Sequence, residues 1–207
     1  MDYRANDKIV PVVCVMPDHV RLSKKDCIAL LGHAEPSVEQ RLGQKGEYLT
    51  SEKIEVEFKN GQTAMLPIIM PFVNKTVVSL CSSTLARLGG KADLKRPSGA
   101  PCSDRCVLRY VDVYRNEYVE KRNAVIRPLR HVHIPLSVRE VYGIALGDTL
   151  IAEVNNDRGV ILDQVYVEDS DNVLGEEIEL HIDKDEGYAF GISEGLTYAK
   201  LYLKEQK

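Results

Sequence analysis

Two histidines separated by one residue are the feature of this sequence whose chemical use is clearest. His131 and His133 stand among β-branched residues, which favour a strand. Side chains at positions i and i+2 of a strand point to the same face, so the two imidazoles can bind one metal ion. His181, in a second strand-like stretch, would supply a third ligand. Three protein ligands and one open position are typical of catalytic zinc, which suits neutral imidazole nitrogens.

The first half of the chain carries a similar but altered set of residues. In both halves a His-Val-x pattern is followed by a serine, a short predicted helix and Leu-Gly. His19 matches His131, but Arg21 takes the place of the second histidine, and Ser79 takes the place of the third. An arginine keeps its charge and has no lone pair for a metal, so we expect His19 to be the remnant of an eroded site. Arg21 would then put a positive charge where a cation would otherwise lie.

The remaining histidine and the cysteines have ordinary explanations. His33 lies in Gly-His-Ala-Glu-Pro, which is typical of a solvated loop. Five cysteines, an odd number, argue against the disulfide framework of a small secreted domain. Cys102 and Cys106 have the spacing of half a zinc site or a redox pair, but no second pair with zinc-finger spacing follows. We therefore interpret them as reduced thiols near a turn, and their role stays open.

Short strands must position these residues. Alternating or continuous apolar runs predict strands at 53–58, 65–70, 75–81, 106–113, 148–154, 159–167 and 176–182. Serine starts and glycine stops predict short helices at 23–31, 82–88 and 137–142. Many short strands with few helices favour a mainly β fold of two similar β-barrel domains, related by internal duplication. We expect a first domain at 1–122, a second at 123–207 and a site between them.

The overall composition excludes several classes of protein. Hydrophobic residues make up 44% of the 207, enough for a core, so the chain is not expected to be disordered. The net charge of −4 argues against nucleic acid as a partner. No apolar run reaches the roughly 20 residues of a membrane helix, and residues 1–8 do not resemble a signal peptide. We therefore expect a cytoplasmic protein without a membrane partner.

Four motifs, in their order along the chain, identify a family resemblance. They are His-Val-x-Leu-Ser at 19–23, Lys-Thr-Val-Val-Ser at 75–79, Arg-His-Val-His-Ile at 130–134 and Leu-His-Ile-Asp-Lys-Asp-Glu at 180–186. The chain resembles the PduL-type phosphotransacylases (phosphate propanoyltransferases) over roughly residues 9–203. The resemblance implies two β-barrel domains with two zinc ions between them. It also implies transfer of an acyl group between coenzyme A and phosphate.

The resemblance also implies ligands, and this sequence departs from several of them. The family's three-histidine zinc site falls on the three histidines of the second half, namely His131, His133 and His181. Its other site, two histidines and a glutamate, falls on His19, Arg21 and Ser79, so only the histidine is kept. A phosphate-binding arginine of the family falls near Val73, and a segment that helps to bind coenzyme A corresponds loosely to 96–101, so the cofactor-binding residues stay unknown.

These departures leave three functions open. The first is a phosphate acyltransferase for acyl-CoA and phosphate with one zinc ion. In it Arg21 and Arg130 would stabilise charge, with Lys75 as a further cation. The second is a catalytically lapsed homologue, a pseudoenzyme that assembles with an active paralogue or with itself. The third is a zinc-dependent thioester or acyl-phosphate hydrolase. Only about eight polar residues precede the first strand, so we expect no N-terminal microcompartment-targeting extension.

Overall fold

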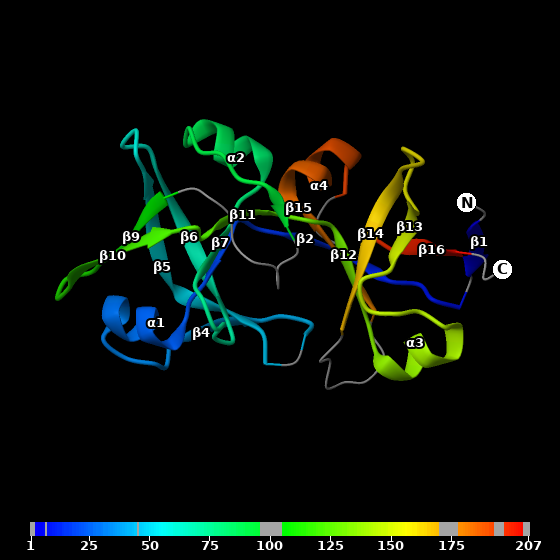
Figure 1. The fold of residues 1–207 in the computed structure, drawn as a ribbon, viewed down its shortest axis with the longest axis horizontal. Helices are drawn as coiled ribbons and strands as arrows, with labels where there is room; N and C mark the ends of the chain where they lie inside the picture. The colour runs from blue at the N-terminus through cyan, green and yellow to red at the C-terminus, as the bar shows by residue number, and fades with distance from the viewer. Residues whose placement is uncertain are drawn as a thin grey trace. The chain divides into compact units, whose positions relative to one another are not determined.

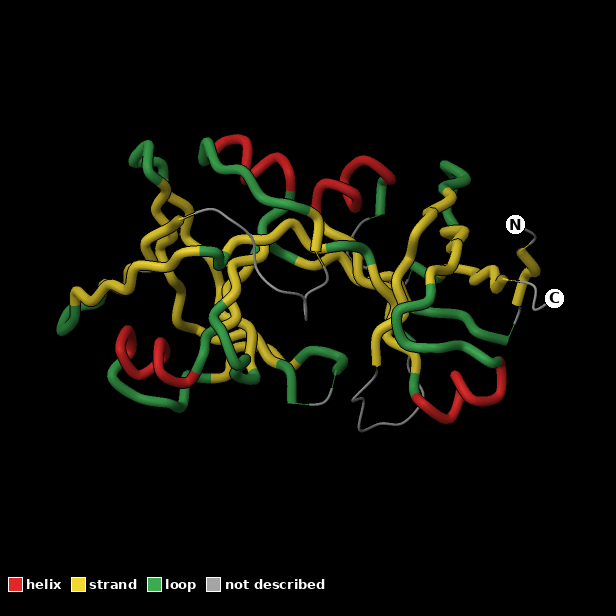
Figure 2. Tube along the Cα trace, viewed as in Figure 1, coloured by secondary structure: helices red, strands yellow, loops and turns green. Residues whose placement is uncertain are grey.

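A computed structural model describes residues 3–6, 8–44, 46–95, 105–169, 178–192 and 197–204. Strands dominate, and the helices are short, which confirms the mainly β expectation (Figure 2). Among these residues no helix is long and apolar enough to cross a membrane.

The chain folds into two compact units, each built on one curled, half-barrel sheet. Unit 1 comprises Met1–Pro17, Gly43–Lys45 and Leu129–Lys207, and unit 2 comprises Asp18–Leu42 and Gly46–Pro128. This division differs from the single boundary expected between residues 122 and 123. The reason is strand pairing: an N-terminal strand joins the sheet of unit 1, and the strand just before residue 129 joins the sheet of unit 2.

Seven strands form the sheet of unit 1 (Figure 1). Their order is β1 (Tyr3–Asn6), β16 (Ala199–Lys204), β13 (Thr149–Val154), β14 (Ile161–Asp169), β12 (His131–Ile134), β15 (Glu179–Asp183) and β2 (Val12–Met16). The described part of the unit also contains the helices α3 (Leu136–Tyr142) and α4 (Lys184–Phe190). Helix α4 contacts β15 and β2, and it starts with a capping box in which Asp183 and Glu186 bond each other's backbone N–H groups.

The sheet of unit 2 has the order β10 (Asn116–Arg122), β9 (Arg105–Val111), β5 (Tyr48–Phe58), β6 (Thr63–Met70), β3 (His19–Arg21), β7 (Val77–Ser79), β11 (Val125–Pro128) and β8 (Leu94–Lys95). Strand β4 (Val38–Arg41) pairs with β5 outside this order. The helices of the unit are α1 (Lys24–Leu31) and α2 (Ser82–Arg87). Helix α1 starts at Ser23, whose hydroxyl accepts a bond from the N–H of Asp26, and ends at Gly32 in the left-handed conformation.

Four strands of each sheet repeat one arrangement. In unit 1 the order β14–β12–β15–β2 has parallel, antiparallel and parallel pairs, and in unit 2 the order β6–β3–β7–β11 has the same three. The two middle strands are each followed by a short helix in both units. This shared topology agrees with the internal duplication expected from the sequence.

Each unit has a hydrophobic core of its own, and the strand period decides which side chains enter it. In unit 1, Val132 and Ile134 of β12 and Leu180 of β15 are fully buried in the core. Residues between them point to the opposite face of the sheet. The face of β12 and β15 that does not enter the core therefore carries the two histidines of β12 and the histidine of β15.

Candidate metal centre

Three neighbouring strands of unit 1 present potential metal ligands on one face. In the antiparallel pairing of β12 with β15, His131 lies opposite His181 and His133 lies opposite Glu179. In the parallel pairing of β15 with β2, His181 is in register with Cys14. Side chains in register on adjacent strands lie on the same face. Imidazole, carboxylate and thiol groups are therefore gathered within three strands.

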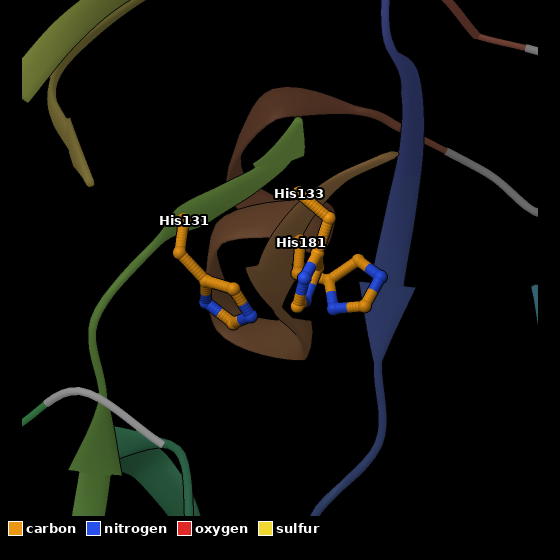
Figure 3. A group of neighbouring side chains, drawn as sticks. All are labelled: His131, His133 and His181. Atoms are coloured by element: carbon orange, nitrogen blue, oxygen red, sulfur yellow. The ribbon is translucent and has the colours of Figure 1, made fainter. Parts of the chain in front are cut away.

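The three histidines predicted as zinc ligands converge. Figure 3 shows their imidazoles directed toward one another from β12 and β15. The ring centroid of His131 is 5.0 Å from the centroid of His133 and also 5.0 Å from that of His181. The centroids of His133 and His181 are 4.7 Å apart. One nitrogen of each ring lies within 4.8 Å of the others. Such a set can close on one ion with small side-chain rotations.

Backbone carbonyls fix the proton position on two of the rings. The Nδ1 atom of His131 is 2.9 Å from the carbonyl oxygen of Leu129, and that of His133 is 2.5 Å from the carbonyl oxygen of Asp169. A carbonyl only accepts, so Nδ1 donates in both bonds and Nε2 keeps its lone pair for a metal. Metal-binding histidines commonly donate their second ring N–H in this way. The donor set therefore fits zinc.

The third ring is oriented by a buried carboxylate. Nε2 of His181 lies 3.1 Å from Oε2 of Glu179, and when Nε2 donates to this carboxylate, the lone pair of the ring lies on Nδ1. Gln44 donates from Nε2 to the same oxygen at 2.6 Å. Burial alone would raise the pKa of Glu179, but the bonds from His181 and Gln44 outweigh burial, and the pKa is lowered. A carboxylate that stays ionised is a strong acceptor for the imidazole N–H.

The segment before β5 fits closely around this carboxylate. A Cβ atom added at Gly43 would lie 1.6 Å from Oε1 of Glu179, so only glycine leaves room for the carboxylate in its present position. The next residue, Gln44, is 4% exposed. Sequence reasoning missed Gly43, Gln44, Glu179 and Cys14. The period of two could have placed Glu179 on the face of His181, but no local signal pointed to the other three.

The two arginines predicted to stabilise charge both form ion pairs. Arg130 lies 2.5 Å from Oε1 of Glu186 and also donates to the carbonyl oxygen of Asp163. Burial raises the pKa of Glu186, although Arg130 acts in the opposite direction. Arg21, in unit 2, lies 2.6 Å from Oε1 of Glu47, and both side chains are less than one-fifth exposed. Each guanidinium is therefore partly neutralised by its neighbouring carboxylate.

The residues expected to be the remnant of a second metal site lie in unit 2. His19 stands opposite Ser79 in the pairing of β3 with β7, and Arg21 stands opposite Val77. This is the register in which His131 stands opposite His181. Within the part of the chain that the structure describes, the groups of three or more potential metal ligands all lie in unit 1.

The other sequence candidates lie apart from the three-histidine group. His33 is exposed in the loop after α1, and Lys75 is exposed before β7. Val73 donates its backbone N–H to the carbonyl oxygen of Leu22. Cys106 is buried on β9, in register with Phe58 on β5. Cys102 and the segment 96–101 lie outside the described residues.

Comparisons with known proteins extend over most of the chain. The sequence profile of the phosphate propanoyltransferase family matches residues 12–193. A phosphate propanoyltransferase of Shewanella putrefaciens is 25% identical over 91% of this chain and 86% of its own length. Proteins of the same name from Clostridioides difficile (26%; 90% and 86%) and Thermotoga maritima (25%; 89% and 85%) match similarly. Together with the converging histidines, these matches show that the chain belongs to the phosphate propanoyltransferase family.

Proposed function

We propose that this protein transfers acyl groups between coenzyme A and phosphate at a one-zinc centre held by His131, His133 and His181. The observation that carries the proposal is the convergence of three imidazoles whose remaining nitrogens are bonded to carbonyl or carboxylate oxygens. The family supplies the reaction class. When bound, zinc would act as a Lewis acid that polarises an oxygen of the acyl or phosphoryl group.

The reaction forms one bond and breaks another at the thioester carbon. A phosphate oxygen attacks the carbonyl carbon of acyl-CoA, the carbon–sulfur bond breaks, and the coenzyme A thiolate leaves and takes up a proton. The protein's part is to hold the reacting groups in position and away from bulk water. His131 and His181 are each 6% exposed, so a charge that develops beside them is poorly screened by solvent. Glu179 keeps the ring of His181 in one orientation.

The direct test is an assay of acyl phosphate and free thiol formed from acyl-CoA and phosphate. We expect turnover by the zinc-loaded chain, loss of turnover with a chelator, and recovery when zinc is restored. His131→Ala removes one zinc ligand and should lower the rate by about 10²–10³, the usual cost of losing one source of oxyanion stabilisation, here the zinc ion. The matched control is His33→Ala, because His33 is an exposed loop residue. Turnover that is indifferent to the chelator would overturn the proposal.

A second candidate is a catalytically lapsed member of the family. It is favoured by one observation, the replacement of two ligands by Arg21 and Ser79, with Arg21 paired to Glu47. Absence of turnover with saturating zinc, together with co-purification with an active homologue, would support it. Thioester hydrolysis that does not depend on phosphate would instead identify a zinc-dependent hydrolase.

A further inference from the structure

A thiol lies next to the three-histidine group, and the proposed acyl transfer does not use it. Cys14 of β2 is in register with His181 of β15. Glu179 lies two residues before His181 on the same face of β15. The thiol sulfur, a carboxylate oxygen and an imidazole nitrogen of these three residues lie within 4.8 Å of one another.

We propose that Cys14, Glu179 and His181 form a second site for a thiophilic divalent ion, zinc or its analogue cobalt. Thiolate, imidazole and carboxylate are the three ligand types of protein zinc sites. Magnesium and calcium prefer sites made of oxygen atoms, so the thiol selects against them. Two ligand atoms that are each bonded to a tetrahedral zinc ion at about 2.0–2.1 Å are roughly 3.3 Å from each other. The 3.1 Å between Nε2 of His181 and Oε2 of Glu179 agrees with that spacing.

The second site is separate from the three-histidine group. Strand β2 is two strands away from β12, which corresponds to roughly 9–10 Å at the usual strand spacing. Of the two groups of potential ligands, Cys14 belongs only to the one with Glu179 and His181. His181 belongs to both groups and has two ring nitrogens. Nε2 faces Glu179 and would bind the second ion, while Nδ1 is left for the first.

The carboxylate of this site is held in position by its own neighbours. Gln44, itself buried, donates to Oε2 of Glu179, and the backbone of Gly43 leaves no room for the carboxylate to move toward it. Metal binding would replace the proton between Nε2 of His181 and Oε2 of Glu179, and it would also release the thiol proton of Cys14. With the first ion already on Nδ1, the expected products are one further bound ion, an imidazolate that bridges the two ions, and two free protons. Without the first ion, the imidazole keeps its proton on Nδ1 and only the thiol proton is released.

Cobalt binding to the metal-free full chain tests this site independently of activity. A thiolate bound to cobalt gives a charge-transfer absorption in the near ultraviolet, whereas histidine and carboxylate ligands do not. We expect this absorption in the wild-type chain and its loss in Cys14→Ser, which changes one partly exposed atom. Cys27→Ala is the matched control, because Cys27 is a buried thiol of unit 2.

A double variant separates the two sites. His131→Ala with His133→Ala removes two ligands of the three-histidine group and leaves Cys14, Glu179 and His181 in place. We expect this variant to keep the thiolate absorption and to bind one cobalt, whereas the wild type binds two. Cys14→Ser should also bind one. An absorption that is absent from the wild type, or that survives Cys14→Ser, would overturn the second site.

The result is distinguishable from a failure of the proposed acyl transfer. A chain that shows the thiolate absorption but no turnover refutes only the acyl transfer. A chain that turns over without the absorption refutes only the second site. His33→Ala should change neither cobalt stoichiometry nor absorption, because His33 is an exposed loop residue.

Discussion

The imidazole of His181 contacts the carboxylate of Glu179 through Nε2, and both side chains come from one face of the same strand. When Nε2 donates in this contact, the lone pair of the ring lies on Nδ1. The same carboxylate and imidazole form a second group of potential ligands with Cys14 on the neighbouring strand β2. One buried carboxylate therefore supports two potential metal positions in unit 1.

Replacing Gln44 with alanine should weaken metal binding without removing a ligand. The variant loses a hydrogen bond to the ionised Glu179, and such bonds contribute about 1.5–3 kcal/mol to the free energy of unfolding. Loss of a group that orients a ligand typically lowers metal affinity by about 10–100-fold. Competition with a chromogenic chelator measures the affinity, and urea unfolding measures the stability. Gln40→Ala, at an exposed position of β4, is the control. Equal zinc affinity in the two variants would contradict the orienting role.

Restoring histidines in unit 2 should create a further metal site. Arg21→His with Ser79→His gives β3 and β7 the three histidines of β12 and β15, in the same antiparallel register. We expect the double variant to bind about one zinc more than the wild type, measured by elemental analysis after dialysis. The control is Arg21→Ala with Ser79→Ala, which breaks the same ion pair with Glu47 but adds no ligand. Identical zinc content in the two double variants would show that register alone does not rebuild the site.

Acid unfolding should depend on Asp26. Burial would raise the pKa of this carboxyl, but Lys121, at 2.5 Å, and the hydroxyls of Thr76 and Ser23 lower it. Its stabilising contribution is therefore complete above the unfolded value of about 3.9, and it is lost as the pH falls through the lower folded pKa.

Asp26→Asn should flatten the acid side of the stability curve. It should also lower the free energy of unfolding at neutral pH, because Lys121 loses its partner; breaking a fully buried ion pair costs about 3–5 kcal/mol. We expect a loss near the low end of this range, because the Lys121 side chain is 23% exposed and water reaches it. Urea unfolding from neutral to acidic pH measures both effects. Asp157→Asn, at an exposed position, is the control. The prediction is wrong if the free energy of unfolding of Asp26→Asn falls with decreasing pH as steeply as that of the wild type and of Asp157→Asn.

The thiol of Cys27 should react slowly with alkylating reagents in the native chain. Burial, with a smaller contribution from Glu52, raises its pKa to about 11, so almost no thiolate is present at neutral pH. Cys14 is partly exposed and should be modified first, and bound zinc should protect it. Mass spectrometry of peptides after timed alkylation distinguishes the two. Rapid modification of Cys27 in the folded chain would be incompatible with its burial.

Several elements were predictable because their signals are local. Alternation in 53–58 marks the end of β5, and the serine and glycine around 23–32 bound α1 to within one residue. Helix α4 was missed although its signal was present, because Asp183 and Glu186 have the spacing of a capping box. Gly187 lies within this helix, and glycine has a low helix propensity, so the sequence pattern did not indicate a helix. Glycine is needed there because a side chain would collide with Val15 on β2.

By itself, the sequence determined which residues can bind a metal and which face of their strand they share. His131, His133 and His181 were predicted as ligands from residue type and the strand period, and comparison of the two halves predicted that Arg21 and Ser79 replace ligands. Tertiary structure decided which strands became neighbours. Pairing between residues distant in sequence leaves no local pattern, so only the fold brings Cys14 and Gln44 to the carboxylate and imidazole of β15. Non-local pairing also places the first strands of the chain in unit 1, together with its last strand.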